Sequence, residues 1–241
     1  MGKVLIACES SGTVRRAFES LGHDSWSCDI KPSEDSSNRH ITADVLDVLS
    51  APELYGRFDL AIVCHPPCTR LCASGVRWLS EPPTNPPSSC IGDESERWAD
   101  MNREQRLALM WEHLRTGADL FDSLLNHTGA PMIACENPVM HSHAKALINF
   151  GEVKPFYVQP WQFATSADSV DNEKKRTGFW ARNLPALIPT GSLDGSSARD
   201  SVHKASPGKN RSTDRSRFFP GMAAAMAEQW GQLLPQSSIT I

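Results

Sequence analysis

Apolar residues occur in short, nearly continuous runs along the first 140 residues of the chain. Such runs are typical of strands that are buried on both faces of a parallel sheet. In residues 4–8 the run is VLIAC, in 58–64 it is FDLAIVC, and in 131–135 it is PMIAC. Together with two more mixed segments, they predict five strands, at residues 4–8, 24–30, 40–44, 58–64 and 131–135.

Between these strands the apolar positions recur at helical spacing. Residues 13–21 predict a helix that Gly22 ends, and residues 103–125 predict a long amphipathic helix. A further helix is expected near the end of the sequence, from residue 219 onward. Alternating strands and helices predict an α/β fold with a mostly parallel, Rossmann-like sheet.

Two segments show neither the apolar runs of strands nor the helical spacing of apolar residues. Residues 81–96 hold four prolines, three serines and one glycine, and residues 191–214 are rich in serine, glycine and basic residues. A long irregular loop inside a compact domain is usually functional or disordered. We therefore expect both segments to be loops.

Composition narrows the class of protein. The 241 residues are 40% hydrophobic and 22% charged, as in soluble globular proteins. No apolar run approaches the roughly 18 residues of a membrane span, so we expect no membrane partner. The seven cysteines are irregularly spaced and follow no secretion signal, which predicts reduced thiols in a cytoplasmic protein. One of these thiols is then available as a nucleophile.

The net charge of −4 is unevenly distributed. Residues 199–217 carry six basic and two acidic side chains, a local charge of +4 on an otherwise acidic chain. A basic strip of this kind is either a contact for phosphates or an ordinary solvated loop.

Polar residues follow each predicted strand. They are Glu9, Asp29, Asp44, the segment from His65 to Cys68, and Glu136. Because ligands of parallel sheets bind at the carboxyl ends of the strands, we expect these side chains to line one pocket.

The segment Pro66-Pro67-Cys68 is the first candidate for chemistry. Two prolines fix the backbone after the strand and would hold the cysteine rigidly at the sheet edge. The plain alternative is a turn with an inert cysteine. A second alternative is a metal site, because Cys64, His65, Cys68 and Cys72 are thiolate and imidazole ligands close together in sequence. Further ligands could come from Cys90, Cys135, His141 and His143, although their spacing matches no zinc signature.

In order along the chain, these elements resemble the cytosine-C5 DNA methyltransferases. Pro66-Pro67-Cys68 and Glu136-Asn137-Pro138 carry most of the resemblance, with His65 in place of a glycine and Pro138 in place of a valine. The resemblance implies that Cys68 adds to C6 of cytosine. It also implies that Glu136 activates the ring at N3 and N4, and that S-adenosylmethionine supplies the methyl group. Amino-methylating enzymes place an aromatic residue after the two prolines, so the cysteine at position 68 argues against that class.

The resemblance also implies a cofactor site along the first strands. The loop from Cys8 to Gly12 replaces a glycine-rich loop and lacks its first glycine. Asp29 corresponds to the residue that binds the ribose hydroxyls, and Asp44 to the one that reads the adenine amino group. The cofactor-binding residues expected are Glu9, Ser10, Gly12, Asp29, Asp44 and Pro66.

DNA contacts are expected from three regions. Residues 72–97 are expected to be mobile without DNA and to close over the extruded base. Arg70, Arg77 and Trp78 are the candidates to contact DNA or to fill the space that the base leaves in the stack. The segment KKRTGFW resembles a basic strand of the family, with Lys174 and Arg176 at the two basic positions. The basic strip adds Arg211, Arg215 and Arg217.

These expectations divide the chain into three parts. Residues 1–180 form the catalytic core, 181–218 a minimal basic target-recognition region, and 219–241 a helix that returns to the core. Only forty residues separate Trp180 from Pro220, as in small phage-borne or orphan members. The expected partner is double-stranded DNA, bound by a monomer. A free cytosine nucleotide as substrate, or a non-catalytic DNA-binding module held by a metal, are the alternatives.

Overall fold

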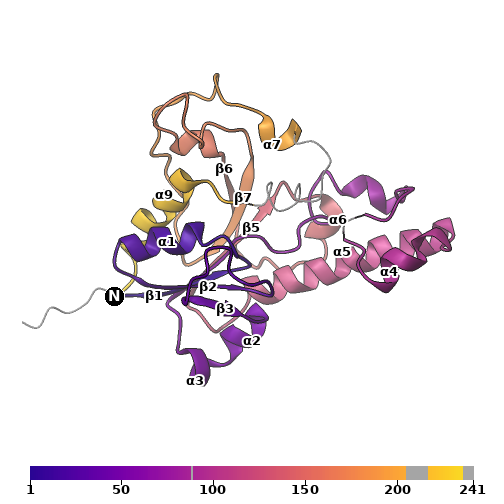
Figure 1. Ribbon diagram of the computed structural model, residues 1–241, viewed down its shortest axis with the longest axis horizontal. Helices are drawn as coiled ribbons and strands as arrows, with labels where there is room; N and C mark the ends of the chain where they lie inside the picture. Colours follow the sequence, from indigo (N-terminus) through magenta and orange to yellow (C-terminus); the bar gives the residue numbers. More distant parts are fainter. Residues whose placement is uncertain (88, 205–216, 236–241) are drawn as a thin grey trace, which may run out of the picture.

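A seven-stranded sheet lies at the centre of the computed structural model, which describes residues 1–87, 89–204 and 217–235 (Figure 1). The strands follow the spatial order β3-β2-β1-β4-β5-β7-β6. The first five are parallel, whereas β7 runs antiparallel to both β5 and β6. Their bounds are β1 Lys3–Ala7, β2 Asp24–Asp29, β3 His40–Thr42, β4 Leu60–Val63, β5 Met132–Pro138, β6 Pro155–Val158 and β7 Thr177–Arg182.

All five predicted strands are present, and the predicted α/β fold with a mostly parallel sheet is confirmed. The order of the first five strands reverses direction between β1 and β4, as in doubly wound Rossmann-like sheets. Two strands end two residues or more away from the predicted position. The third strand stops at Thr42, two residues short of Asp44. The fifth continues to Pro138, because β7 pairs with it beyond the point where β4 ends.

Helices cover both faces of the sheet. Successive residues of β1 point to opposite faces, so Leu5 packs in one hydrophobic cluster and Ile6 in the other. Helices α1 and α9 contribute to the Ile6 side, whereas α2 and α5 contribute to the Leu5 side. The helices are α1 Thr13–Ser20, α2 Val45–Ser50, α3 Pro52–Tyr55, η1 Val76–Leu79, α4 Asp93–Glu96, η2 Arg97–Ala99, α5 Arg103–Leu125, α6 Ser142–Lys145, η3 Pro160–Phe163, α7 Ser201–Lys204 and α9 Pro220–Gly231.

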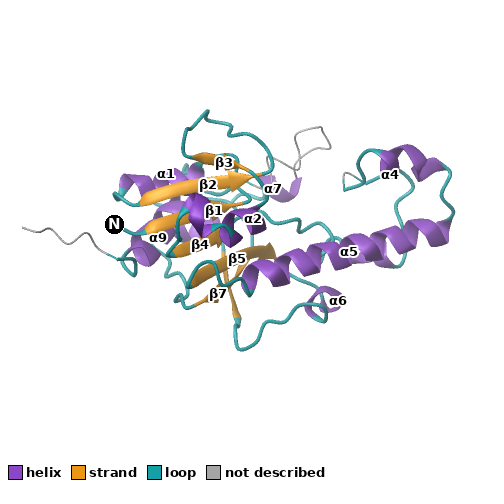
Figure 2. Cartoon of the chain, turned by 90° about the horizontal axis from the view of Figure 1, so that it is seen from below, coloured by secondary structure: helices purple, strands orange, loops and turns teal. Residues whose placement is uncertain are grey.

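Helix α5 has the predicted bounds. Asn102 and Gln105 form a capping box at its start, which satisfies backbone N–H groups that the first turn leaves free. All of its buried residues lie from Met110 onward, where the helix packs on the sheet. Its first turns project past the sheet together with η1, α4 and η2, and we call residues 76–87 and 89–113 the arm (Figure 2).

The arm includes the segment that was expected to be an irregular loop. Within the predicted loop of residues 81–96, residues 93–96 instead form the short helix α4, and η2 follows at residues 97–99. Tryptophan side chains tie the arm together: Trp98 Nε1 donates to the Thr84 carbonyl at 3.1 Å, and Trp111 Nε1 donates to the Leu79 carbonyl at 3.1 Å. Hydrogen bonds from tryptophan side chains to backbone carbonyls leave no period in the sequence, so the apolar pattern could not predict them.

The last described helix packs against the core. Met222, Met226 and Trp230 of α9 are buried in the same cluster as Phe18 of α1. Trp230 Nε1 donates to the Pro185 carbonyl at 3.0 Å, which joins α9 to the segment that follows β7. None of the described helices is long and apolar enough to cross a membrane.

Candidate functional site

A pocket of about 230 Å³ opens at the carboxyl ends of β1, β2, β4 and β5. It lies where the strand order reverses between β1 and β4, because the loops after these two strands diverge and leave a crevice. Its lining residues are Cys8, Ser10, Ser11, Asp29, Lys31, Glu34, His65, Pro66, Pro67, Cys68, Thr69, Glu136, Pro138, Lys175 and Arg217. The structure therefore brings together Cys68, Glu136, Ser10, Asp29, Pro66 and Arg217 of the predicted site residues.

Cys68 is held by the backbone that surrounds it. After β4, Pro66 is buried and Cys68 opens a tight turn, whose carbonyl accepts from the N–H groups of Leu71 at 2.9 Å and Cys72 at 3.0 Å. Gly75 packs directly against this turn: a Cβ at Gly75 would lie 2.0 Å from the Thr69 carbonyl oxygen. Only glycine permits this approach, so the turn that carries the thiol is fixed from two sides.

Glu136 enters the pocket from β5. The last pair between β4 and β5 joins Val63 to Cys135, so Glu136 is the first residue of β5 that β4 no longer covers. On its other side, Glu136 pairs with Phe179 of β7, which holds the backbone in strand conformation. The residue is 4% exposed, and burial raises the pKa of its carboxyl group to about 7, with Lys175 acting in the opposite direction.

The two reactive side chains affect each other. Burial raises the pKa of the Cys68 thiol to about 12, and the negative charge of Glu136 contributes to the rise. Lys175 opposes both shifts. The pocket therefore holds a neutral thiol beside a carboxyl group that can carry a proton near neutral pH.

The segment just before α9 closes one side of the pocket. Lys175 Nζ donates to the Arg217 carbonyl at 3.3 Å, and the Arg217 guanidinium contacts Glu34 at 2.7 Å. The ring of Phe218 lies 4.9 Å from that of His65. Burial and the nearby Lys175 lower the pKa of His65 well below its usual value, so its ring is neutral.

The opposite side of the pocket is formed by the loops after β1 and β2. Ser10 Oγ donates to the Glu34 carboxylate at 2.8 Å. Asp29 ends β2, and one of its oxygens accepts from the Lys31 N–H at 2.9 Å. Hydroxyl and carboxylate groups thus face the same space from two neighbouring loops.

Three residues that were predicted to bind the cofactor lie outside the pocket lining. The buried Glu9 carboxylate accepts from the N–H groups of Val14 at 2.9 Å and Arg15 at 3.3 Å, so it caps α1. Asp44 accepts from the Leu46 N–H at 2.8 Å as the N-cap of α2. Gly12 has a φ of 69° and begins α1. In this structure the Glu9 and Asp44 carboxylates cap helices, because free N–H groups at a helix start attract nearby carboxylates, and their predicted cofactor contacts stay predictions.

The two arginines predicted near the base are both engaged with the protein. Arg70 is 3% exposed, and its Nη2 donates to Ser89 Oγ at 3.0 Å. The Arg77 guanidinium lies 4.2 Å from the centre of the Trp78 ring. Arg70 is buried in this structure, so its predicted contact with DNA requires its side chain to move and stays a prediction.

The basic pair predicted before β7 is also placed differently. Lys174 is exposed, and the Arg176 guanidinium lies 4.6 Å from the centre of the Tyr157 ring. Lys175, between them, is the residue that lines the pocket. No period in the sequence distinguishes Lys175 from its neighbours, because β7 begins only at Thr177 and both Thr177 and Gly178 are buried.

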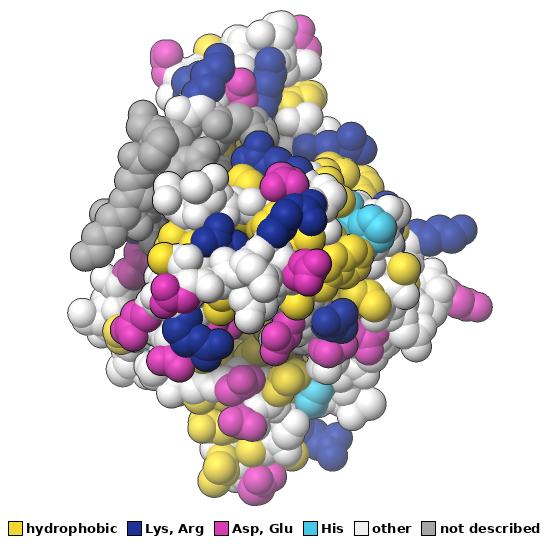
Figure 3. Space-filling model, turned by 90° about the vertical axis from the view of Figure 1, so that its right-hand side faces the viewer, with side chains coloured by type: hydrophobic (Ala, Val, Ile, Leu, Met, Phe, Trp, Pro, Cys, Tyr) yellow, Lys and Arg dark blue, Asp and Glu magenta, His cyan; other side chains and the backbone are white. Residues whose placement is uncertain are grey.

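The basic strip is described only in part. Arg211 and Arg215 lie outside the described residues, whereas Arg217 lines the pocket. Arg199 is held by the carbonyls of Ala167, Ser169 and Val170. On the face shown in Figure 3, Lys and Arg side chains lie among Asp and Glu, so charge alone does not mark that face as a phosphate surface.

The metal site considered from sequence is not assembled. Cys64 is fully buried in the hydrophobic cluster on the α1 side of the sheet. Among the described residues, its thiol does not converge with His65, Cys68 or Cys72 on a common point where a metal ion could bind. Within the described part of the chain, the side chains whose ligand atoms converge are instead Cys90, Glu94 and His113.

Comparisons with known proteins give distant structural likenesses. No family model and no curated protein sequence matches the chain. One similar solved structure is described as a DNA modification methyltransferase encoded within an E. coli prophage, with 12% identity and a TM-score of 0.36 over 75% of this chain and 46% of that one. A mutant of Spodoptera frugiperda DNMT2 has 13% identity and a TM-score of 0.39 over 83% of this chain and 56% of its own.

The chain thus spans about half the length of these two solved structures. At TM-scores below 0.5, neither likeness bears on the chemistry of the pocket. The fold class rests on the strand order and directions, and the function rests on the side chains that the pocket brings together.

Proposed function

We propose that this chain transfers a methyl group from S-adenosylmethionine to C5 of cytosine in double-stranded DNA, through a covalent bond to Cys68. The observation that carries the proposal is that Cys68 and Glu136, from the ends of two neighbouring parallel strands, line the same pocket. The sequence predicted that each of the two residues follows a strand. In the structure, the basic residue Lys175 lines the same pocket.

The proposed chemistry divides the work between the two side chains. The Cys68 thiolate adds to C6 of the ring, while the Glu136 carboxyl group donates to N3 and accepts from the exocyclic amine at N4. The electron pair displaced by the addition makes C5 nucleophilic, and C5 would take the methyl group from the sulfonium of S-adenosylmethionine, whose sulfur keeps the bonding pair and leaves as a neutral thioether. Loss of the C5 proton to solvent and departure of the thiolate then restore the aromatic ring and the free enzyme.

The electrostatics of the pocket suit these roles. A carboxyl pKa of about 7 means that Glu136 carries the proton it must donate in a large fraction of molecules at neutral pH. A thiol pKa of about 12 leaves roughly one thiolate in 10⁵ molecules at pH 7, so the thiol must lose its proton as the base binds. Lys175 lowers the pKa of both groups and is the basic residue placed to assist that loss.

The donors on the β1 and β2 side fit S-adenosylmethionine. The ribose of the cofactor offers two hydroxyl groups, and Asp29 has a carboxylate oxygen beyond the one that accepts from Lys31. Ser10 and Ser11 add hydroxyl groups in the same pocket. When bound, the cofactor supplies an electrophilic methyl group on a sulfonium centre. Glu9 already occupies the start of α1, so this helix end is closed to the cofactor's own carboxylate.

Duplex DNA is the proposed partner. The target atom of a paired cytosine is buried in the stack, so the base must be extruded to reach Cys68. The division into a core of residues 1–180, a target-recognition region of 181–218 and a C-terminal helix of 219–241 belongs to this proposal, as do a monomeric state, a cytoplasmic location and a phage origin.

The deciding experiment is incubation of the full chain with duplex DNA and methyl-labelled S-adenosylmethionine, followed by analysis of the individual bases. Label in 5-methylcytosine supports the proposal. Label that appears only when free cytidine nucleotides are supplied would replace DNA with a nucleotide substrate. Label in another base, or in none although the cofactor binds, contradicts the cytosine-C5 assignment.

A further inference from the structure

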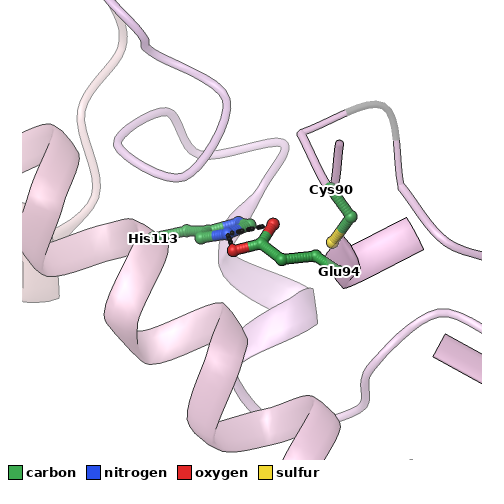
Figure 4. Close-up of side chains that lie close together, drawn as sticks. All are labelled: Cys90, Glu94 and His113. Carbon is green, nitrogen blue, oxygen red and sulfur yellow. Dashed lines mark hydrogen bonds and ion pairs between the residues drawn. The ribbon is translucent and has the colours of Figure 1, made fainter. Parts of the chain in front are cut away.

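Three metal-ligating side chains of different chemistry meet in the arm, outside the pocket. Cys90 precedes α4, Glu94 lies on α4, and His113 lies on the facing side of α5 (Figure 4). One ligand atom from each lies within 4.8 Å of the other two. The residues are spread over 23 positions of sequence, so tertiary packing of α4 on α5 creates the cluster.

The cluster is partly shielded from solvent. Cys90 is 5% exposed, and the His113 side chain is 16% exposed. His113 Nε2 lies 3.0 Å and 3.1 Å from the two Glu94 oxygens. The other ring nitrogen, Nδ1, is buried without a hydrogen-bond partner among the described residues. A histidine fixed in this way already presents one nitrogen toward the carboxylate and the thiol.

Arg70 adds a second, independent observation. Its side chain is buried beside the cluster, and Nη2 donates to Ser89 Oγ, next to Cys90, at 3.0 Å. Two of its nitrogens, Nε and Nη1, are buried and have no hydrogen-bond partner in the described chain. A buried guanidinium needs negative charge beside it, and a metal-bound thiolate at Cys90 would supply that charge.

The donor set suits zinc. Thiolate, imidazole and carboxylate are the ligands that Zn²⁺ takes in proteins, with bonds of about 2.0–2.3 Å. Tetrahedral geometry at those bond lengths places ligand atoms about 3.3–3.7 Å apart, so a spread of up to 4.8 Å requires a contraction of about 1 Å. Small rotations of the Cys90 and Glu94 side chains are sufficient for that, because the histidine and the carboxylate are already in contact.

We propose that Cys90, Glu94 and His113 bind one Zn²⁺ ion, which fastens the loop before α4 to helix α5. The ion would hold the arm in one conformation, with water as its fourth ligand. This site is separate from the pocket and does not depend on the proposed methyl transfer.

The test uses the full chain, reduced and stripped of metal by a chelator. Zinc is titrated against a chromophoric chelator, and Co²⁺ is added separately as a spectroscopic probe. We expect one Zn²⁺ per chain, and a thiolate-to-cobalt charge-transfer band in the near ultraviolet. His113→Gln and Glu94→Gln should each weaken zinc binding at least about tenfold, and Cys90→Ser should also remove the band.

Matched variants outside the cluster provide the controls. Cys28→Ser changes another buried cysteine, and His143→Gln changes an exposed histidine; both should retain full affinity and the cobalt band. Circular dichroism of each variant establishes that it is folded. Absence of stoichiometric zinc binding overturns the proposal, as does binding that Cys68→Ser abolishes while Cys90→Ser leaves it intact.

Discussion

Cys68 and Glu136 lie in one buried pocket, close enough for the carboxylate charge to raise the pKa of the thiol. They come from the loop after β4 and from β5, which are neighbours in the sheet but lie 68 positions apart in sequence. Because the charge of Glu136 disfavours the Cys68 thiolate, we expect substrate binding to activate the thiol. This expectation can be tested by several measurements.

Cys68→Ala should abolish methyl transfer, by on the order of 10³-fold or more, and leave S-adenosylmethionine binding nearly unchanged. The reason is that the thiol contacts the base, whereas the cofactor donors lie on β1 and β2. DNA containing 5-fluorocytosine should form a covalent adduct with the wild-type chain, because the fluorine cannot leave as a cation. Denaturing electrophoresis detects the adduct.

The control for this trap is Cys72→Ala, which changes a buried cysteine four residues away and outside the pocket lining. It should still form the adduct. An adduct in Cys68→Ala as strong as in wild type would move the nucleophile elsewhere.

The pH dependence of kcat/KM should rise about tenfold per pH unit up to about pH 7 and then level off. Below pH 7 both groups are protonated, so the reactive form with a Cys68 thiolate and a protonated Glu136 grows as the pH rises. Between about 7 and 12 the dominant form has lost the Glu136 proton instead. This dominant form and the reactive form carry the same number of protons, so the ratio of their populations, and with it kcat/KM, does not change with pH.

Glu136→Gln supplies the contrast for this profile. Only Cys68 then titrates in the pair, so the residual rate should continue to rise above pH 7. A wild-type profile that climbs steadily from pH 6 to pH 9 would contradict the role of Glu136 as the proton donor.

The stability of the wild type relative to Glu136→Gln should also depend on pH. The folded-state pKa of about 7 is above the ordinary value of 4.5, so the wild type loses stability as the pH rises from 4.5 to 7. The loss amounts to about 3 kcal/mol at most. Denaturant unfolding should therefore find the variant more stable than wild type at pH 8 and similar to it near pH 4. Equal stabilities at both pH values would place Glu136 in a solvated environment.

Lys175→Met should shift the acid limb of the rate profile to higher pH. Lys175 lowers the pKa of Glu136, so its loss raises that pKa and delays deprotonation of the carboxyl group. Lys174→Met is the matched control, because it removes the same charge from the exposed neighbouring position. It should leave the midpoint of the acid limb in place. Equal shifts in both variants would mean that only the overall charge matters.

Glu9→Ala should destabilise the fold by about 1–2 kcal/mol, because it uncaps α1. Glu9→Gln should cost less, since the amide oxygen can still accept from the Val14 N–H and the buried charge is removed. Calorimetric titration with S-adenosylmethionine should find a similar affinity in the folded Glu9→Gln variant. A loss of cofactor affinity without a loss of stability would restore the direct role that sequence suggested for Glu9.

The apolar pattern by itself predicted the five parallel strands, because burial on both faces leaves a continuous apolar run, and it predicted the bounds of α5. It also placed Cys68 and Glu136 after strands, but it did not predict the antiparallel strands β6 and β7. Which polar residue reaches the pocket was decided only by the tertiary structure. Glu9 and Asp44 follow strands as expected, yet nearby helix starts take their carboxylates. Lys175 lines the pocket whereas Lys174 is exposed, and the packing of the segment before β7 decides between them. The cluster of Cys90, Glu94 and His113 depends on how α4 packs on α5, a contact between separate helices that no local period encodes.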